Sequence, residues 1–406
     1  MIVEYHAIQS FAPANLNRDD AGVPKSCTFG GVLRARVSSQ SWKRAIRMRF
    51  VNGDFGLATG LRTKRAHQAI VDRLTSGDVP LDEDRARHRA AVVLEAEPIG
   101  VGLVIGDDQN ESSEIKTKQL IFFREEDLDV LADVAREFGE EIDKLPSSVG
   151  GLGDGDSGAE KDSSPKRGKK ERKKISLPKE AADRIKEILN GPGRTADVAL
   201  FGRMLAELPT AKVEASCQVA HAIGTHRLAA EHDFYTAVDD RKPDDNEGAD
   251  MMGVIEYNAS CLYRYAALDL GQLAENLGST AAEDEVQKIV AAFTEAFALA
   301  VPSGKQNSFA AHNPPNCLLV TARESGAWNL ANAFADPVDG SRSDGGIVKE
   351  SVERMRKQLR TIEGMFGSKE APLRGKVLSE FPGLDWGPTI EQVDNLEAIT
   401  AWNPEA

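Results

Sequence analysis

The sequence has little of the features that mark several protein classes. Its four cysteines (Cys27, Cys217, Cys261 and Cys317) lie far apart with no CxxC pair, which argues against a zinc site and fits a reducing compartment. No apolar run approaches the ~18 residues of a membrane span, and the first residues, MIVEYHAIQSF, lack the basic start and long apolar core of a secretory signal. We therefore expect a soluble, cytoplasmic protein that has no metal or other cofactor and no membrane contact.

Positive charge is also in short supply. The chain has 50 lysines and arginines against 64 aspartates and glutamates, which gives a formal net charge of −14. An acidic balance by itself counts against nucleic-acid binding, so any such binding would need a local track of positive charge. With 406 residues, the chain is long enough for about two or three domains and a substantial core.

One stretch, residues 29–50, reverses this charge balance. It reads FGGVLRARVSSQSWKRAIRMRF, and the part from Arg34 to Arg49 holds six basic residues and no acidic one. The alternation over residues 32–37 predicts a strand with one solvated face, and Ser38 or Ser39 can cap a helix that begins there. The spacing i, i+3, i+4 and i+7 places four polar side chains on one face of this helix: Gln40, Lys43, Arg44 and Arg47.

Two interpretations of this cationic face compete. A solvated helix face is the usual meaning of such a pattern. However, no acidic residue at i+3 or i+4 relieves the repulsion among Lys43, Arg44 and Arg47. An anion near the helix N-terminus would do so, because exposed N–H groups and the helix dipole favour negative charge there. Repeated phosphates fit best, since the GxxxxGK[ST] loop of nucleotide-binding proteins is absent from this stretch.

A series of short motifs runs along the chain in a specific order. They are LNRDD (16–20), RARVSSQS (34–41), FGRM (201–204), AHAIGTH (220–226), DFYTAVDD (233–240), LYRYA (262–266), GKQNSFAAHNP (304–314) and ANAF (331–334). In this order the motifs resemble those of the backbone subunit (CasC or Cse-type, RAMP superfamily) of the type I-E CRISPR surveillance complex, Cascade. The resemblance spans most of the chain, with gaps between about 60 and 195 and after about 335.

This resemblance implies an α+β fold: an RRM-like (ferredoxin-like) palm, a helical fingers insertion and a β-hairpin thumb. The palm would comprise residues 1–58, 196–227 and 261–406, the fingers 59–195 and the thumb 228–260. Within the fingers, residues 146–175 have no apolar periodicity and a basic end, so we expect a disordered loop. The periodicity elsewhere predicts helices at 39–50, 61–76, 82–96, 127–138, 284–300 and 346–363, and strands at 2–8, 32–37, 213–226, 262–270 and 318–321.

The function that the resemblance implies is non-catalytic. Several copies would assemble head to tail along a CRISPR guide RNA and display it for pairing with a target DNA strand in antiviral defence. Other partners would be the large, small, guide-end-capping and guide-processing subunits of Cascade. We assign to guide phosphates and sugars Arg18, Lys25, Arg36, Ser38, Gln40, Lys43, Arg44, Arg47, Lys305 and Gln306. We assign to a displaced base Met204, Tyr235, Thr236 and Met252.

The predicted thumb is acidic, so it cannot hold RNA through phosphates. Aromatic and apolar side chains such as Tyr235 and Met252 can instead unstack or support a base. The alternative is that these residues form an ordinary two-layer core. Likewise Met204 can wedge beside a base, as the resemblance implies, or simply fill core space.

Two other functions stay open. Asp19 and Asp20 suggest a metal-dependent ribonuclease, although they can equally pair with Arg18 and nearby lysines or cap a turn. The chain can also be a single-copy RRM-like RNA-binding protein. Because type I-E backbone subunits are not known to cut nucleic acid, we expect no catalytic residue.

Overall fold

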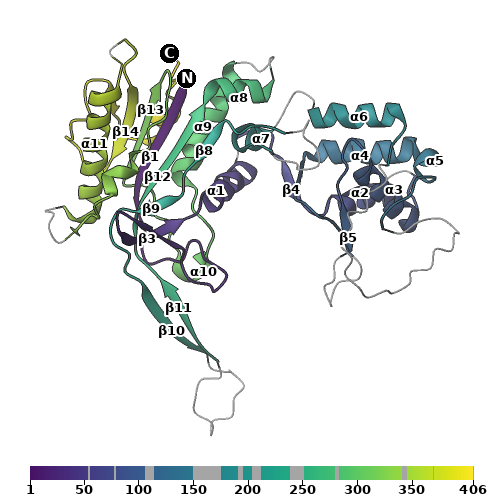
Figure 1. The fold of residues 1–406 in the computed structure, drawn as a ribbon, viewed down its shortest axis with the longest axis horizontal. Helices are drawn as coiled ribbons and strands as arrows, with labels where there is room; N and C mark the ends of the chain where they lie inside the picture. Colours follow the sequence, from purple (N-terminus) through teal and green to yellow (C-terminus); the bar gives the residue numbers. More distant parts are fainter. Residues whose placement is uncertain are drawn as a thin grey trace, which may run out of the picture. The chain divides into compact units, whose positions relative to one another are not determined.

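The computed structural model of the protein divides into two compact units (Figure 1). Unit 1 comprises Met1–Leu57 and Ala215–Ala406, and unit 2 comprises Ala58–Glu214. The structure describes residues 1–53, 55–76, 79–105, 114–149, 175–190, 195–203, 212–237, 251–278, 283–340, 345–368 and 370–405. Residues 196–203, which the sequence analysis assigned to the palm, belong to unit 2.

Unit 1 is built on a 9-stranded mixed sheet in the order β15-β14-β13-β1-β12-β9-β3-β2, with β8 also paired to β12. All neighbours are antiparallel except β14 and β15. The strands are β1 (Ile2–Ser10), β2 (Ser26–Phe29), β3 (Val32–Val37), β8 (Cys217–Val219), β9 (Ala222–Gly224), β12 (Cys261–Asp269), β13 (Cys317–Arg323), β14 (Arg374–Ser379) and β15 (Ile390–Gln392). The sequence analysis did not predict β2, β14 or β15.

Helices cover both faces of this sheet, so its central strands are buried on both sides (Figure 1). On β1, Tyr5 packs against Phe293 of α9 (Glu283–Leu299), with ring centroids 5.0 Å apart, while His6 on the opposite face contacts Tyr263 and Tyr265. The α9 face also carries α1 (Ser39–Asn52) and α8 (Leu270–Leu277), and α12 (Leu396–Thr400) contacts α9. The other face carries α11 (Gly346–Phe366) and the 3₁₀ helix η2 (Leu330–Phe334).

The predicted solvated face of β3 is wrong for Arg34, which is fully buried. Its guanidinium donates to the carbonyls of Gly224 and Thr225 at 3.1 and 2.8 Å and to that of Phe334 at 2.8 Å. It also donates to two further carbonyls, those of Phe29 and Ala335. Arg34 therefore ties β2, β9 and η2 together, and its charge belongs to the core rather than to the surface.

The predicted hairpin is present as β10 (Glu231–Ala237) and β11 (Met251–Tyr257). The register pairs Phe234 with Val254 and Thr236 with Met252, so these four side chains share one face. Phe234 is 62% exposed, Val254 61% and Met252 68%. The alternative of an ordinary two-layer core is therefore wrong for this segment of the chain.

Unit 2 combines helices with short two-stranded sheets around its own apolar core. Its elements are β4 (Leu61–Thr63), α2 (Ala66–Thr75), α3 (Glu83–Glu95), β5 (Leu103–Ile105), β6 (Ile115–Thr117), β7 (Ile121–Phe123), α4 (Glu125–Glu137), α5 (Gly139–Ile142), α6 (Lys179–Asn190) and α7 (Ala196–Phe201). The helix predicted from residue 61 begins only at Ala66, because Leu61–Thr63 pairs with β7. Most of the predicted basic loop, residues 150–174, lies outside the described residues.

Candidate nucleic-acid interface

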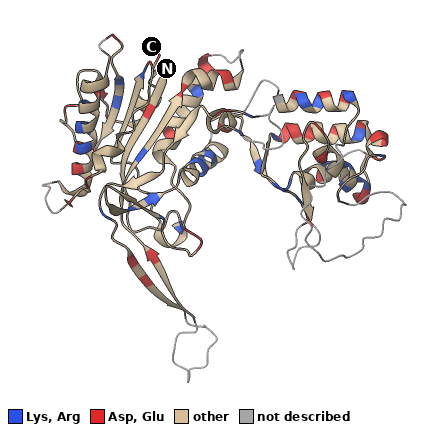
Figure 2. Ribbon diagram, in the orientation of Figure 1, with Lys and Arg blue, Asp and Glu red and all other residues tan. Residues whose placement is uncertain are grey.

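Helix α1 begins at the end of β3 and is anchored by one apolar face. Ser38 caps it, because the Ser38 Oγ accepts a hydrogen bond from the Ser41 N–H at 3.4 Å. Trp42, Ile46 and Phe50 are buried. The opposite face carries the cations seen in Figure 2: Arg44 is exposed, and Lys43 and Arg47 are half-buried.

A buried cation lies beneath this helix. The guanidinium of Arg264 on β12 stacks between the rings of Trp42 (3.7 Å) and Phe297 (4.4 Å). It donates to the Gln9 Oε1 at 2.6 Å and to the Phe297 carbonyl at 2.5 Å, both of which are neutral acceptors. Burial lowers the pKa of Arg264 to about 9, so Arg264 stays charged at neutral pH and adds positive potential under α1.

The loop of residues 11–25 is held beside the N-terminus of α1 by Asn17. The Asn17 Oδ1 accepts from the Ser38 N–H at 2.8 Å, and its carbonyl accepts from the Lys25 N–H at 2.9 Å. The Lys25 carbonyl in turn accepts from the Arg36 N–H at 2.9 Å. These contacts bring Lys25, Arg36 and the start of α1 together.

A second loop, residues 303–310, joins this group. Gly304 lies so close to the backbone of Leu16 that a Cβ at position 304 would collide with the Leu16 carbonyl. The next residue, Lys305, has φ +51, a left-handed conformation that is strained for a residue other than glycine. The close approach places Lys305 beside the loop that carries Arg18 and Lys25.

A shallow groove runs between these elements and the root of the hairpin. It holds about 320 Å³ of space, part of it open to solvent, and its polar lining residues are Asn17, Lys25, Arg36, Asn258 and Ser260. Apolar side chains complete its lining: Phe11, Ala14, Leu16, Pro24, Ala35, Val37 and Leu262. A lining that combines the cations Lys25 and Arg36 with apolar side chains suits a sugar-phosphate chain with its attached bases.

Two residues predicted to contact a guide have other roles in the structure. The Gln306 Nε2 donates to the carbonyls of Pro302 and Ala311 at 3.1 and 3.3 Å, so this amide holds its own loop together. Ser38 is buried and caps α1. Gln40 and Arg18 are exposed.

The hairpin residues predicted to contact a base divide between two faces. Thr236 and Met252 pair directly and lie on the exposed face with Phe234. Tyr235 lies on the other face, where its ring covers Gly253. Met204 lies outside the described residues. Thr236 and Met252 can therefore contact the same ligand, whereas Tyr235 reaches a different side of the hairpin.

The hairpin is acidic and firmly rooted. Its described strands carry Glu231, Asp233 and Glu256 and no lysine or arginine (Figure 2). The Tyr257 ring packs on Phe309 with centroids 5.5 Å apart, and the Asn15 Nδ2 donates to the Glu256 carbonyl at 2.9 Å. The loops that carry the cations thus also fix the base of the hairpin.

Asp19 adopts the turn-capping role that the sequence analysis kept as an alternative. Its Oδ1 accepts from the N–H groups of Ala21 and Val23 at 2.9 and 3.0 Å. Asp20 is exposed. Among the residues that the structure describes, no group of three or more His, Cys, Asp or Glu side chains is arranged to hold a metal ion.

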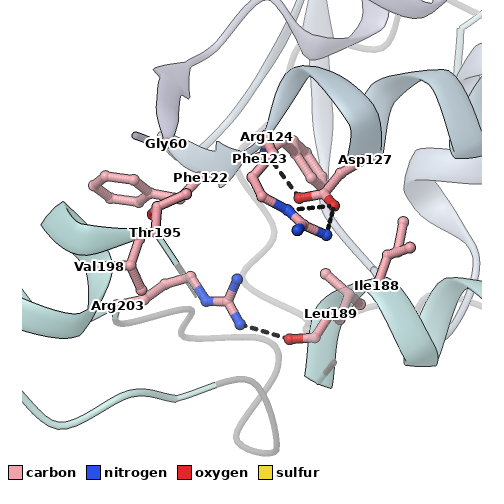
Figure 3. Close-up of a pocket in the computed structure, with 10 residues that line it drawn as sticks. All are labelled: Gly60, Phe122, Phe123, Arg124, Asp127, Ile188, Leu189, Thr195, Val198 and Arg203. Atoms are coloured by element: carbon pink, nitrogen blue, oxygen red, sulfur yellow. Dashed lines mark hydrogen bonds and ion pairs between the residues drawn. The ribbon is translucent and has the colours of Figure 1, made fainter. Parts of the chain in front are cut away.

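Unit 2 has a pocket of its own, with about 380 Å³ of partly open space (Figure 3). Its charged side chains have partners within it: the Arg124 Nη2 lies 2.7 Å from the Asp127 Oδ1, and the Arg203 Nη2 donates to the Leu189 carbonyl at 2.8 Å. Phe122 contributes an aromatic wall on which Arg62 stacks at 5.6 Å. These partners stabilise the walls of the pocket.

Sequence reasoning missed one residue at the interface, His221. It is exposed and its Nδ1 lies 3.1 Å from the Arg36 Nη1. The proximity results from the pairing of β9 with β3, in which Arg36 faces Ile223 and Val37 faces Ala222. A strand register between residues 185 positions apart in the sequence cannot be read from local patterns, although the AHAIGTH motif did mark the segment.

Comparison with known proteins identifies the family. Residues 3–386 match the family model described as CT1975-like protein. The chain belongs to the CT1975-like family. A search of curated proteins gives no match for this CT1975-like chain. In the part of the chain that the structure describes, no helix is both long and apolar enough to cross a bilayer.

Solved structures similar to this CT1975-like chain come from CRISPR complexes. One chain of a "CRISPR RNA-guided surveillance complex, pre-nicking" is 30% identical with a TM-score of 0.80, and the match covers 99% of both chains. A chain of a second "CRISPR RNA-guided surveillance complex" is 26% identical with a TM-score of 0.72, again over 99% of both chains. The resemblance to Cascade backbone subunits is thereby confirmed, and it extends through the regions where the motifs gave no match.

Proposed function

We propose that this protein is a non-catalytic, cytoplasmic backbone subunit of a type I-E Cascade complex that binds the CRISPR guide RNA. The observation that carries the proposal is the cluster formed by Lys25, Arg36, the cationic face of α1 and Lys305 in a chain of net charge −14. A local group of cations in an acidic protein is the electrostatic footprint of a bound polyanion.

The sheet supports an RRM-like palm of the RAMP superfamily. Strands β13, β1, β12 and β9 lie side by side, and α1 and α9 pack against each other on one face. This is the arrangement that a βαββαβ unit with insertions would give. The remaining strands and α11 are additions to it.

The hairpin supports head-to-tail assembly. Its exposed apolar face, with Phe234, Met252 and Val254, is available to displace a guide base. Its acidic strands complement a basic surface of the next copy. Heterologous contacts of this kind do not close, so they generate a helical filament along the RNA.

Sequence recognition would then belong to the guide. Bases between successive hairpins pair with the target DNA strand, while the protein contacts the guide backbone. The large, small, guide-end-capping and guide-processing subunits of Cascade would bind the ends and flanks of this filament.

The test uses the complex purified from the co-expressed operon. Lys43→Glu with Arg47→Glu should abolish guide retention, because two attractive charges become repulsive beside the phosphates. Arg49→Glu is the matched control on the same helix, since the Arg49 Nη2 pairs with the Glu295 Oε1 at 2.9 Å. Equal guide content in the double variant and the wild type would refute the assignment of α1.

The same preparations separate the two alternative functions. Native mass spectrometry should give several copies per guide, and one copy per guide would favour a single-copy RNA-binding protein. Incubation with complementary RNA and Mg²⁺ should leave the RNA intact. Specific cleavage that is lost in Asp19→Ala would instead establish a metal-dependent ribonuclease.

A further inference from the structure

His221 occupies a defined place at the proposed guide site. Continuing the antiparallel register of β3 and β9 by one residue places it opposite Ser38, the residue that caps α1. Its ring lies beside Arg36, and Arg36 also donates from its Nε to the Ser26 carbonyl at 3.2 Å. His221 therefore lies beside Arg36, which lines the groove, and opposite the residue that caps α1.

The contact with Arg36 defines the protonation state of the ring. A guanidinium has only donors, so the Arg36 Nη1 at 3.1 Å must donate to the His221 Nδ1. The Nδ1 then carries no proton, and the single ring proton lies on the Nε2. In the absence of an anion, His221 is neutral and acts as an acceptor for Arg36.

A phosphate would reverse this arrangement. If a phosphate oxygen accepts the Arg36 Nη1 hydrogen bond, the His221 Nδ1 loses its donor and can bind a proton. The imidazolium and the guanidinium then both donate to the phosphate, which is the charge-assisted geometry that anions bind most tightly. The proton comes from solvent and forms an N–H bond at the His221 Nδ1, and no other covalent bond forms or breaks.

We propose that His221 is a further ligand for a guide phosphate and that it takes up a proton when the RNA binds. This inference rests on the proposed RNA-binding function and adds a residue and a pH dependence to it. The ligand chemistry is a phosphodiester of single-stranded RNA, held between Arg36 and His221 at the N-terminus of α1.

The charges around His221 support the direction of the coupling. In the protein without RNA, partial burial lowers the pKa of His221, and the positive charges of Arg36 and Lys25 lower it further. Arg36 faces the ring from β3 and Lys25 from the segment before β2. Arg36 and Lys25 are both positively charged, so a negatively charged phosphate bound between them raises the pKa of His221.

The sign of the pH dependence follows from this difference. Because the pKa is lowered in the RNA-free state and higher in the complex, the complex binds more protons between the two values. The added affinity is therefore fully present below the RNA-free pKa and is lost as the pH rises through the pKa of the complex. Each pKa unit between the RNA-free protein and the complex changes the RNA affinity tenfold.

The experiment measures binding of a fluorescein-labelled oligouridine to the full-length chain by anisotropy, at constant ionic strength, between about pH 5 and 8. The wild type should bind about tenfold more tightly at the acidic end. His221→Asn should remove most of this dependence, and His312→Asn, another exposed histidine, should retain it. Thermal melting of each variant checks that its fold is intact.

A second measurement follows the titration of His221 directly in the wild-type protein by NMR. With ¹³C-labelled histidine, the resonance of His221 should titrate at a higher pH in the presence of the oligouridine than in its absence. Strong RNA binding with the same pH dependence in the wild type and His221→Asn would overturn this proposal and leave the proposed function standing. Absence of RNA binding at every pH would overturn both.

Discussion

The cationic face of α1 leads to a quantitative prediction about salt dependence. Replacing Lys43, Arg44 and Arg47 together by alanine removes three positive charges from one helix face without touching its buried anchors. We expect weaker RNA binding and, more specifically, a shallower dependence of affinity on salt. Both effects follow from the release of counterions when cations neutralise phosphates.

The magnitude can be worked from the number of cations. For single-stranded nucleic acid, each phosphate contact contributes about 0.7 to the slope of log K against log salt. Loss of three contacts should therefore reduce the slope by about 2. With about 1 M salt as the reference, a slope of about 0.7 makes each phosphate contact strengthen binding roughly fourfold at about 0.15 M salt. Loss of three contacts should therefore make the triple variant bind roughly 50-fold more weakly at about 0.15 M salt.

The assay is anisotropy of labelled oligouridine over a series of salt concentrations, with the full-length chain. Arg49→Ala is the control, because Arg49 lies in the last turn of the same helix, outside the face that carries Lys43, Arg44 and Arg47. It should keep the wild-type slope. If the triple variant also keeps the wild-type slope, the α1 face does not contact phosphates and the reasoning is refuted.

Three further predictions concern the elements that hold the site. Arg34→Met leaves buried carbonyls without their donor and should lower the free energy of unfolding by about 3–5 kcal/mol. Calorimetry should show this as a fall of Tm by roughly 6–20 °C, and an unchanged Tm would contradict the prediction. Glu4→Gln breaks the buried pair with Arg323, whose Nε lies 2.6 Å from the Glu4 Oε2. The free energy of unfolding measured with urea should fall by about 3–5 kcal/mol, and a fall of less than about 1 kcal/mol would count against a buried ion pair at this place. Gly304→Ala should weaken RNA binding, because the added Cβ pushes two loops apart. Gly364→Ala, whose added Cβ meets nothing within 4 Å, should leave RNA binding unchanged. Equal RNA affinities of the two variants would show that this loop contact does not contribute to binding.

Local patterns predicted the elements that carry the site. β3 matches the predicted strand at residues 32–37, and α1 begins where a serine was expected to cap it. The paired strands β10 and β11 form the expected hairpin. These predictions succeeded because periodicity and capping act over a few residues and leave direct marks in the sequence.

Features that depend on long-range packing could not be predicted in this way. Arg34 looked like a surface cation because a strand alternates, yet carbonyls from distant segments surround it. Gln306 looked like a ligand donor, but its amide binds its own loop. His221 reaches Arg36 only through the register of β9 on β3. Each depends on which segments the fold brings together, and a single sequence does not encode that locally.

The C-terminal strands illustrate another reason for failure. β14 and β15 are short, and β15 lies at the edge of the sheet with exposed side chains. Such strands lack both a continuous apolar run and clean alternation, so period-based reasoning has no signal to detect. β14 is placed in the sheet by pairing with β13, and β15 by pairing with β14, rather than by a pattern in their own sequences.

The most direct test of the central claim is an electron cryomicroscopy map of the intact complex with its guide. We predict that guide phosphates lie against the N-terminal half of α1, beside Lys25 and Arg36. A map in which the cationic face of α1 points into solvent, with the RNA bound elsewhere on the chain, would contradict the account.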